Sequence, residues 1–140
     1  MRLFTLEKAE KLIPKIARLV KRAQRLQGRI ACLVELHDAS VEINTDDGFH
    51  YFMTPELGVN KEFHRYYYQF YKALEDIALM GAFLRDLEDG IVDFPCEING
   101  KDAFYCWQMG EIRISHWHGL DECFDERHPI LDMDELLGSE

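Results

Sequence analysis

The chain has 140 residues, of which 47% are hydrophobic and 30% are charged, so it is long enough for one globular domain with a buried core. Its 26 acidic and 16 basic residues give a net charge of −10, which argues against nucleic acid and anionic membranes as partners. No apolar run approaches the roughly 18 residues of a membrane span, and the first residues lack the apolar stretch of a secretory signal. These observations exclude disordered, fibrous and membrane-spanning classes and predict a single soluble, cytoplasmic domain over residues 1–140.

An amphipathic helix is predicted over residues 6–37. Thr5 is suited to cap it, and Glu7 stands in the first turn, where a negative charge is favourable. Basic residues run alongside the leucines on the opposite face, as on a helix surface exposed to water. Basic-zipper DNA-binding proteins instead carry their basic residues on an extension N-terminal to the leucines, so this pattern argues against DNA binding. Apolar side chains recur every three or four residues, and leucines seven residues apart widen the stripe: Ala9, Ile13, Ile16, Val20, Ala23, Leu12, Leu19, Leu26 and Leu33.

The next segment, residues 38–60, interrupts this period and is predicted to be a variable insertion, either a small hairpin or an ordered loop. A second helix is predicted over residues 61–88, with Asn60 as its cap and Gly90 just beyond its end. Its apolar positions again recur at steps of three and four residues. Two helices with matching stripes and a folded connection predict a long antiparallel helical hairpin.

Three short antiparallel strands are predicted over residues 91–118, and Asn99-Gly100 is the strongest turn signal between them. If both turns have two residues, Cys106 lies opposite Asp93 on one side and Arg113 on the other. A one-residue bulge would exchange the two faces beyond it. The face expected to cover the helices carries Val92, Phe94, Cys96, Ile98, Ala103, Tyr105, Trp107, Ile112, Ile114, His116 and His118.

The predicted fold is therefore α+β, a long antiparallel helical hairpin with a small three-stranded antiparallel β-sheet at the C-terminal end. An acidic tail follows over residues 119–140. Residues 1–30 carry +7 and the remaining 110 carry −17, a separation that favours self-association. Because two helices and a small sheet leave much of the apolar stripe uncovered, a homodimer is predicted.

Several uncommon residues occur in a fixed order along both ends of the chain. The first group is Phe4-Thr5-Leu6-Glu7, Ala9 and Leu12-Ile13-Pro14; the second is Gly90-Ile91-Val92-Asp93-Phe94-Pro95, Cys106-Trp107, Gly110-Glu111, Trp117-His118, Phe124, Arg127 and Pro129. With this pattern the chain resembles the bacterial and archaeal family catalogued as domain of unknown function 2203. The resemblance implies a helical hairpin plus a small sheet, and it brings no assigned activity. It marks as family-pattern positions Asp93, Cys106, Trp107, Glu111, Trp117, His118 and Arg127. Cys123 and the additional His116 depart from the family pattern.

One candidate site is a metal centre near the end of the predicted sheet. Two histidines at positions i and i+2 of a strand point the same way, and zinc takes three or four ligands of these types. Zinc or another divalent metal would be the ion, although no cofactor is predicted outright. The alternative is structural, with His118 packed at the sheet end and its N–H held by Asp121. The candidate ligands are His116, His118, Asp121, Cys123 and His128.

A second candidate is a polar pocket for a small anionic ligand. Arginine binds carboxylate or phosphate through two parallel hydrogen bonds, and a nearby cation would favour the Cys106 thiolate, which could pair with His118 as a nucleophile. Ordinary cross-strand ion pairs are the alternative. The candidate residues are Asp93, Cys106, Glu111, Arg113 and Arg127.

Two functions remain open from the sequence. The leading prediction is a dimeric interaction or scaffold module without catalysis of its own. The alternative is a metal- or anion-binding domain, or a small enzyme, with a site at Asp93, Cys106, His118 and Arg127. Since no Ser-His-Asp, Walker, Rossmann or HExxH motif is present, the sequence names no catalytic residue and leaves open whether the protein is an enzyme.

Overall fold

The computed structural model describes residues 3–36, 40–44, 49–53 and 57–130. Within these ranges the chain forms two α-helices, a two-stranded hairpin and a five-stranded antiparallel sheet of order β3-β4-β5-β6-β7. The predicted α+β class is confirmed, but the prediction of three strands is wrong because β3 and β7 extend the sheet at its edges. The elements in chain order are α1 (Leu6–Leu36), β1 (Ser40–Asn44), β2 (Phe49–Met53), α2 (Leu57–Leu79), β3 (Phe83–Asp86), β4 (Ile91–Ile98), β5 (Lys101–Gln108), β6 (His116–Gly119), the 3-10 helix η1 (Phe124–Glu126) and β7 (His128–Pro129).

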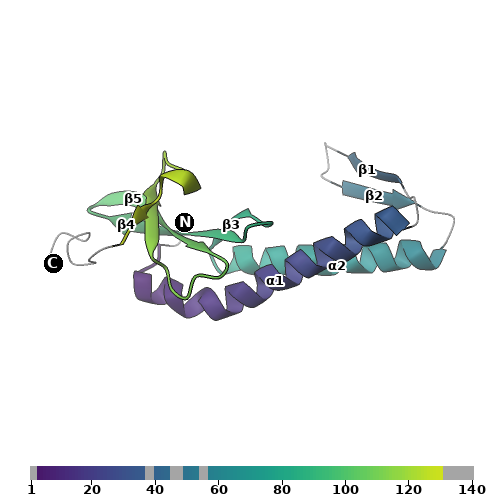
Figure 1. Ribbon diagram of the computed structural model, residues 1–140, viewed down its shortest axis with the longest axis horizontal. Coiled ribbons are helices and arrows are strands. Elements are labelled where there is room, and N and C mark those ends of the chain that lie inside the picture. The colour runs from purple at the N-terminus through teal and green to yellow at the C-terminus, as the bar shows by residue number, and fades with distance from the viewer. Residues whose placement is uncertain (1–2, 37–39, 45–48, 54–56, 131–140) are drawn as a thin grey trace.

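Helix α1 begins where its cap predicts. The Thr5 hydroxyl accepts a hydrogen bond from the backbone N–H of Lys8 at 3.2 Å, which satisfies one of the free donors of the first turn. Figure 1 shows α1 running away from the sheet and α2 running back beside it, so the two form an antiparallel hairpin. The apolar row of α1 is buried as its spacing predicts: Ala9, Ile13, Ile16, Val20 and Ala23.

Helix α2 differs from the predicted range of 61–88 at both ends. It begins at Leu57, so Asn60 lies inside the helix, and it ends at Leu79. The end is set by Gly81, whose φ of 92° leaves the helical region and is easily reached only by glycine. Residues beyond it form β3, although the apolar period continues through Leu84 and Leu87. Gly90 therefore closes the turn between β3 and β4 and does not cap a helix.

Strands β4 and β5 pair as predicted, with Asp93 opposite Cys106 and Ile98 opposite Lys101. The predicted pairing of Cys106 with Arg113 is wrong, because Cys106 lies opposite His116, three residues further along. The connection between β5 and β6 is longer than two residues. Its first part folds back on β5, because Trp107 Nε1 donates a hydrogen bond to the carbonyl of Glu111 at 2.9 Å. An odd shift exchanges the faces of a strand. His116 and His118 therefore face away from the helices, and Trp117 faces the helix-side core.

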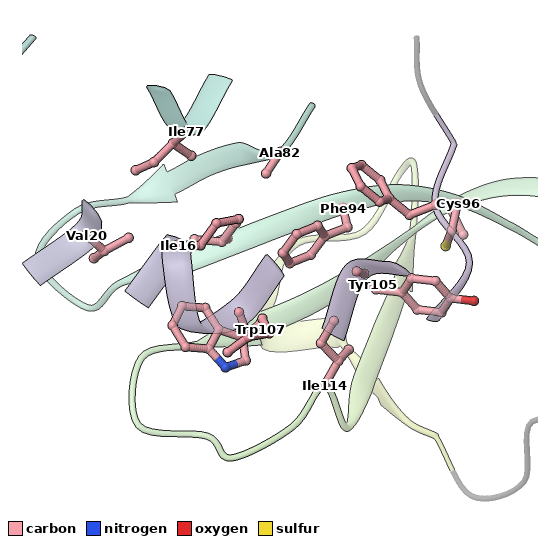
Figure 2. Packing of buried hydrophobic residues seen from close by; sticks show 14 of the residues in the cluster. Ile16, Val20, Ile77, Ala82, Phe94, Cys96, Tyr105, Trp107 and Ile114 are labelled. Carbon is pink, nitrogen blue, oxygen red and sulfur yellow. The ribbon is translucent and has the colours of Figure 1, made fainter. Parts of the chain in front are cut away.

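The core lies between α1 and the sheet, where Ile16 and Val20 of α1 meet Phe94 of β4 and Trp107 of β5 (Figure 2). The other face of the sheet is covered by the segment over residues 119–130, which lies opposite the helices in Figure 1. Because both faces are covered, every residue from Ile91 to Cys96 is buried. Asp93 and His118 on the second face are thereby removed from water.

Inside the predicted insertion, β1 and β2 pair as an antiparallel hairpin, in register from Ser40–Met53 to Asn44–Phe49. This confirms the hairpin among the two alternatives, while the turn at residues 45–48 lies outside the described residues. The C-terminal part of the predicted acidic tail, residues 131–140, also lies outside them. Among the helices that the structure describes, none combines the length and the apolar character needed to cross a membrane.

Candidate metal centre

Three neighbouring strands bring together one carboxylate, one thiol and one imidazole. Asp93 of β4 lies opposite Cys106 of β5, and His118 of β6 is paired with Phe104, two residues before Cys106. Because Cys106 and Phe104 are separated by two positions, their partners share one face of the sheet. The exposed fractions of Asp93, Cys106 and His118 are 2%, 0% and 4%, and one ligand atom from each lies within 4.8 Å of the others.

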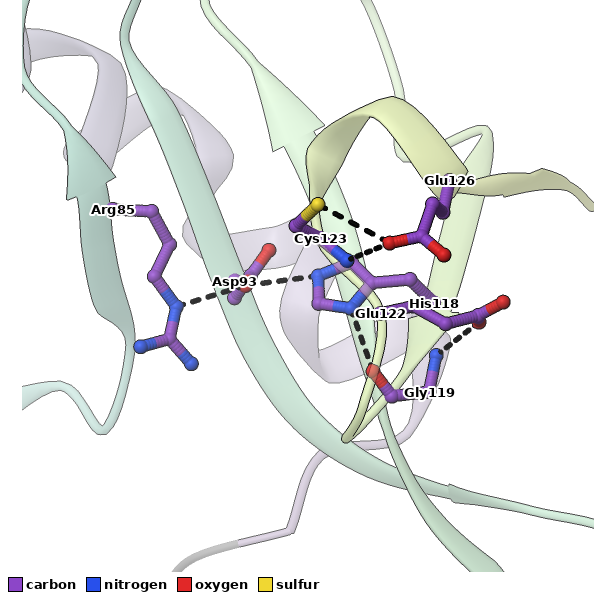
Figure 3. A network of polar contacts seen from close by, with 7 residues as sticks. All are labelled: Arg85, Asp93, His118, Gly119, Glu122, Cys123 and Glu126. Carbon is purple, nitrogen blue, oxygen red and sulfur yellow. Dashed lines mark hydrogen bonds and ion pairs between the residues drawn. The ribbon is translucent and has the colours of Figure 1, made fainter.

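The Asp93 carboxylate is held through only one of its two oxygens. Oδ2 accepts a hydrogen bond from Arg85 Nε at 3.0 Å and lies 2.9 Å from His118 Nε2 (Figure 3). Oδ1 is buried and has no hydrogen-bond partner among the described residues. A buried oxygen without a partner loses its hydration with no compensation, at a cost of about 1–3 kcal/mol or more for a charged group. The site therefore has a buried acceptor that makes no hydrogen bond to the described residues.

The ring of His118 is fixed by two oxygen atoms. Nδ1 lies 2.9 Å from the carbonyl oxygen of Gly119, which can only accept, so Nδ1 carries a hydrogen. In a neutral ring Nε2 then presents a lone pair to the Asp93 carboxylate, which is unfavourable. Three arrangements remove this repulsion: a proton on Nε2, a proton on the carboxyl group, or a metal ion bound by Nε2 and the carboxylate. An N–H held by a backbone carbonyl is also typical of metal-binding histidines.

Cys106 lies between the Asp93 carboxylate and the Arg127 guanidinium. Burial raises the pKa of the Cys106 thiol to about 12, and the negative charge of Asp93 raises it further, whereas Arg127 acts in the opposite direction. The thiol is thus protonated at neutral pH. A reactive cysteine has a lowered pKa, so the raised pKa of Cys106 is the opposite of what a nucleophile needs. Both ring nitrogens of His118 also already face oxygen atoms. The geometry therefore does not favour a Cys106–His118 nucleophile pair.

The five metal ligands that the sequence predicts do not meet in one place. His118 lies in the buried cluster, whereas His116 Nδ1 is 3.0 Å from the Ser115 hydroxyl. His128 Nε2 contacts Glu122 at 2.9 Å, and the Cys123 thiol donates to Glu126 at 3.3 Å. Asp121 is exposed and does not hold the N–H of His118, which goes to Gly119.

The residues predicted for a polar pocket are also divided. Asp93 and Cys106 belong to the buried cluster, and Arg127 reaches it from the segment after η1. Glu111 binds Arg127 Nη1 at 3.4 Å and thus holds it from the other side. Arg113 is exposed and takes no part, because the loop after β5 carries it away from the sheet.

Arg85 is the functional residue that sequence reasoning missed. It lies on β3, in a stretch where the apolar helical period continues, and it holds Asp93 from the edge of the sheet. The sequence signal that could have found it is Gly81, which separates the helical run from Phe83–Asp86. The site thus has a cation on each side, Arg85 beside Asp93 and Arg127 beside Cys106.

A comparison with family models identifies the chain. The model of an uncharacterized conserved protein, DUF2203, matches residues 2–130. The chain belongs to the DUF2203 family. No curated protein and no solved structure matches it. Membership in DUF2203 confirms the resemblance seen in the sequence, and the function has to be argued from the site itself.

Proposed function

We propose that this DUF2203 protein binds a divalent transition-metal ion through Asp93, Cys106 and His118. The observation that carries the proposal is Oδ1 of Asp93, a buried carboxylate oxygen without a partner among the described residues, beside a thiol and an imidazole. An ion between these groups would satisfy Oδ1, take the lone pair of His118 Nε2 and remove the repulsion between Nε2 and the carboxylate.

The donor set indicates which ion fits. Sulfur, nitrogen and oxygen ligands together suit zinc, which binds them at about 2.0–2.3 Å, whereas calcium and magnesium prefer oxygen ligands alone. Ligand atoms within 4.8 Å of one another come close to the spacing that one such ion requires. Three protein ligands leave one position of a tetrahedral ion free, as in catalytic zinc sites, while structural sites use four.

The surrounding residues support the same proposal. Arg85 holds Oδ2 of Asp93, which leaves Oδ1 to the ion, and the Gly119 carbonyl orients the ring of His118. Arg127 lies beside Cys106 and favours the thiolate that metal binding requires. Contacts of this kind fix the direction of metal ligands, and their loss typically weakens metal binding by about 10–100-fold.

The test is elemental analysis of protein purified without added metal, followed by zinc titration against a chromophoric chelator. We expect one ion per chain, and a dissociation constant raised at least about a hundredfold in Cys106→Ser, His118→Gln and Asp93→Asn. Thermal unfolding of each variant would show that it is folded.

Matched controls distinguish this centre from the ligand set predicted from sequence. Cys123→Ser, His128→Gln and Asp102→Asn remove the same three residue types outside the buried cluster and should leave zinc binding within about twofold of the wild type. Zinc binding that depends on Cys123 and His128 would contradict the proposed centre. A wild-type protein that neither contains nor takes up zinc, cobalt or nickel would overturn it.

We also propose, as a second function, that the chain acts as a homodimeric interaction module through α2. Three large side chains of this helix are exposed: Tyr68 at 71%, Tyr71 at 46% and Leu79 at 72%. Their exposure shows that no described residue covers them, and the N-terminal part of α2 extends beyond the sheet (Figure 1). Exposed aromatic groups on one element are typical of protein interfaces.

The dimer is tested by light scattering at high micromolar concentration. We expect twice the mass of the chain for the wild type and a shift toward the single-chain mass for Tyr68→Glu and Leu79→Glu, because a buried unpaired charge opposes association. Glu88→Gln, at an exposed position outside α2, serves as the control. A wild type that stays at the single-chain mass would contradict this second function.

A further inference from the structure

A pocket of about 460 Å³ opens beside the candidate metal centre, between β3 and the segment after β6. Asp93 and His118 form part of its wall, whereas Cys106 does not reach it. An ion held by the three residues would therefore be shielded on its Cys106 side and accessible from the pocket. The fourth ligand of such an ion would come from this pocket.

Arg85 presents a binding group to the same pocket. Its Nε is used by Asp93, and its guanidinium carbon lies 5.0 Å from the ring centre of Phe104 and 5.1 Å from that of Phe83, which fixes its orientation. Within the described residues its two terminal amino groups have no hydrogen-bond partner, and 48% of the side chain is exposed. A guanidinium edge with two free amino groups matches a carboxylate through two parallel hydrogen bonds.

The other charged groups of the pocket are carboxylates with partners of their own. Glu122 accepts from the backbone N–H of Gly119 at 2.8 Å and contacts His128, and Asp86 accepts from the backbone N–H of Asp89 at 3.0 Å. With these acids present, Arg85 alone would hold an anion weakly. A divalent ion at the centre supplies the additional positive charge, so anion binding should depend on the metal.

The remaining wall of the pocket is apolar. Phe104 lies between Arg85 and His118, since its ring contacts both, and three further apolar side chains face the same space. The apolar lining comprises Ile91, Phe104, Leu120 and Phe124. Such a wall favours a ligand with an apolar group attached to its anionic end over a small inorganic anion.

We infer that this pocket binds a small carboxylate with an apolar substituent, whose carboxylate bridges the Arg85 guanidinium and the metal ion. The apolar substituent lies against Phe104, Leu120 and Phe124. This inference rests on the metal site proposed above and names the class of ligand that the site takes.

The experiment uses protein loaded with cobalt(II), because the visible absorption of the ion reports a change in its ligands. The cobalt-loaded protein is titrated with benzoate, acetate, benzamide and inorganic phosphate. We expect benzoate to shift the cobalt bands and to bind at least about tenfold more tightly than acetate, because its ring is buried against the apolar wall. Benzamide, which has the same shape without the charge, and phosphate should bind more weakly than benzoate.

Two variants test the named contacts. Arg85→Gln should weaken benzoate binding by about 10–100-fold, while Arg113→Gln, at an exposed arginine outside the pocket, should leave it unchanged. Leu120→Ala should reduce the preference for benzoate over acetate without changing the affinity for acetate. Cobalt binding is measured in each variant, so a loss of the metal is separated from a loss of the anion.

The outcomes separate the two proposals. Cobalt binding with no response to benzoate would overturn the inference and leave the metal site standing, whereas a protein that binds no cobalt would overturn both. Phosphate binding as tight as benzoate binding would refute the apolar carboxylate as the ligand class. Benzoate binding that is unchanged in Arg85→Gln would refute the bridging arrangement.

Discussion

Zinc binding to this protein should tighten by at least about tenfold for each unit of pH between about pH 6 and about pH 8. Burial raises the pKa of the Cys106 thiol to about 12, so the thiol is protonated throughout this range in the metal-free protein. Zinc binds the thiolate, and binding therefore releases at least this proton. Because release is favoured when protons are scarce, affinity rises with pH. The measurement is a chelator competition at each pH, corrected for the titration of the chelator.

A direct count of released protons provides the control for this dependence. In a weakly buffered solution with a pH indicator, zinc should release at least one proton per chain from the wild type and from Cys123→Ser, whose thiol lies outside the buried cluster. Cys106→Ser should lack this proton along with most of its affinity. An affinity that is independent of pH, with no proton released, would show that Cys106 is not a ligand.

The local parts of the fold could be predicted from sequence. The Thr5 cap, the buried row of α1 and the β4–β5 register all follow from signals within a few residues, such as Asn99-Gly100. The end of α2 could not be placed because the apolar period of the helix continues beyond Gly81, where a change of backbone angle overrides it. For the same reason, strand β3 could not be predicted from the sequence. The contact between Arg85 and Asp93, which depends on β3, could not be predicted either.

For a related reason, the sequence assigns the residues of the candidate site to two separate sites. Asp93 and Cys106 lie on strands joined by a two-residue turn, so their pairing followed from arithmetic. His118 lies beyond the loop over residues 109–115. The path of this loop depends on the hydrogen bond from Trp107 to the Glu111 carbonyl and on the ion pair between Glu111 and Arg127. Only the odd shift in register places His118 on the face of Asp93. Two candidate sites in the sequence thus contribute to one centre in the structure.

Trp107→Ala should lower the free energy of unfolding by about 3–5 kcal/mol, a large share of the 5–15 kcal/mol that holds a typical domain together. Only 1% of the Trp107 side chain is exposed, and it packs in the core between α1 and the sheet. The substitution leaves a cavity in the core between α1 and the sheet, which the neighbouring side chains fill only in part. It also removes the hydrogen bond from Nε1 to the Glu111 carbonyl, and Glu111 in turn holds Arg127 beside Cys106.

Urea unfolding followed by circular dichroism measures this effect, and Ile112→Ala in the same loop is the matched control. Because 96% of Ile112 is exposed, its removal should change stability by no more than about 0.5 kcal/mol. Trp107→Phe should retain most of the packing and lose the hydrogen bond, so its stability should lie between the two. Equal stability of Trp107→Ala and Ile112→Ala would show that the loop does not depend on this anchor, and the position of Arg127 would then need another explanation.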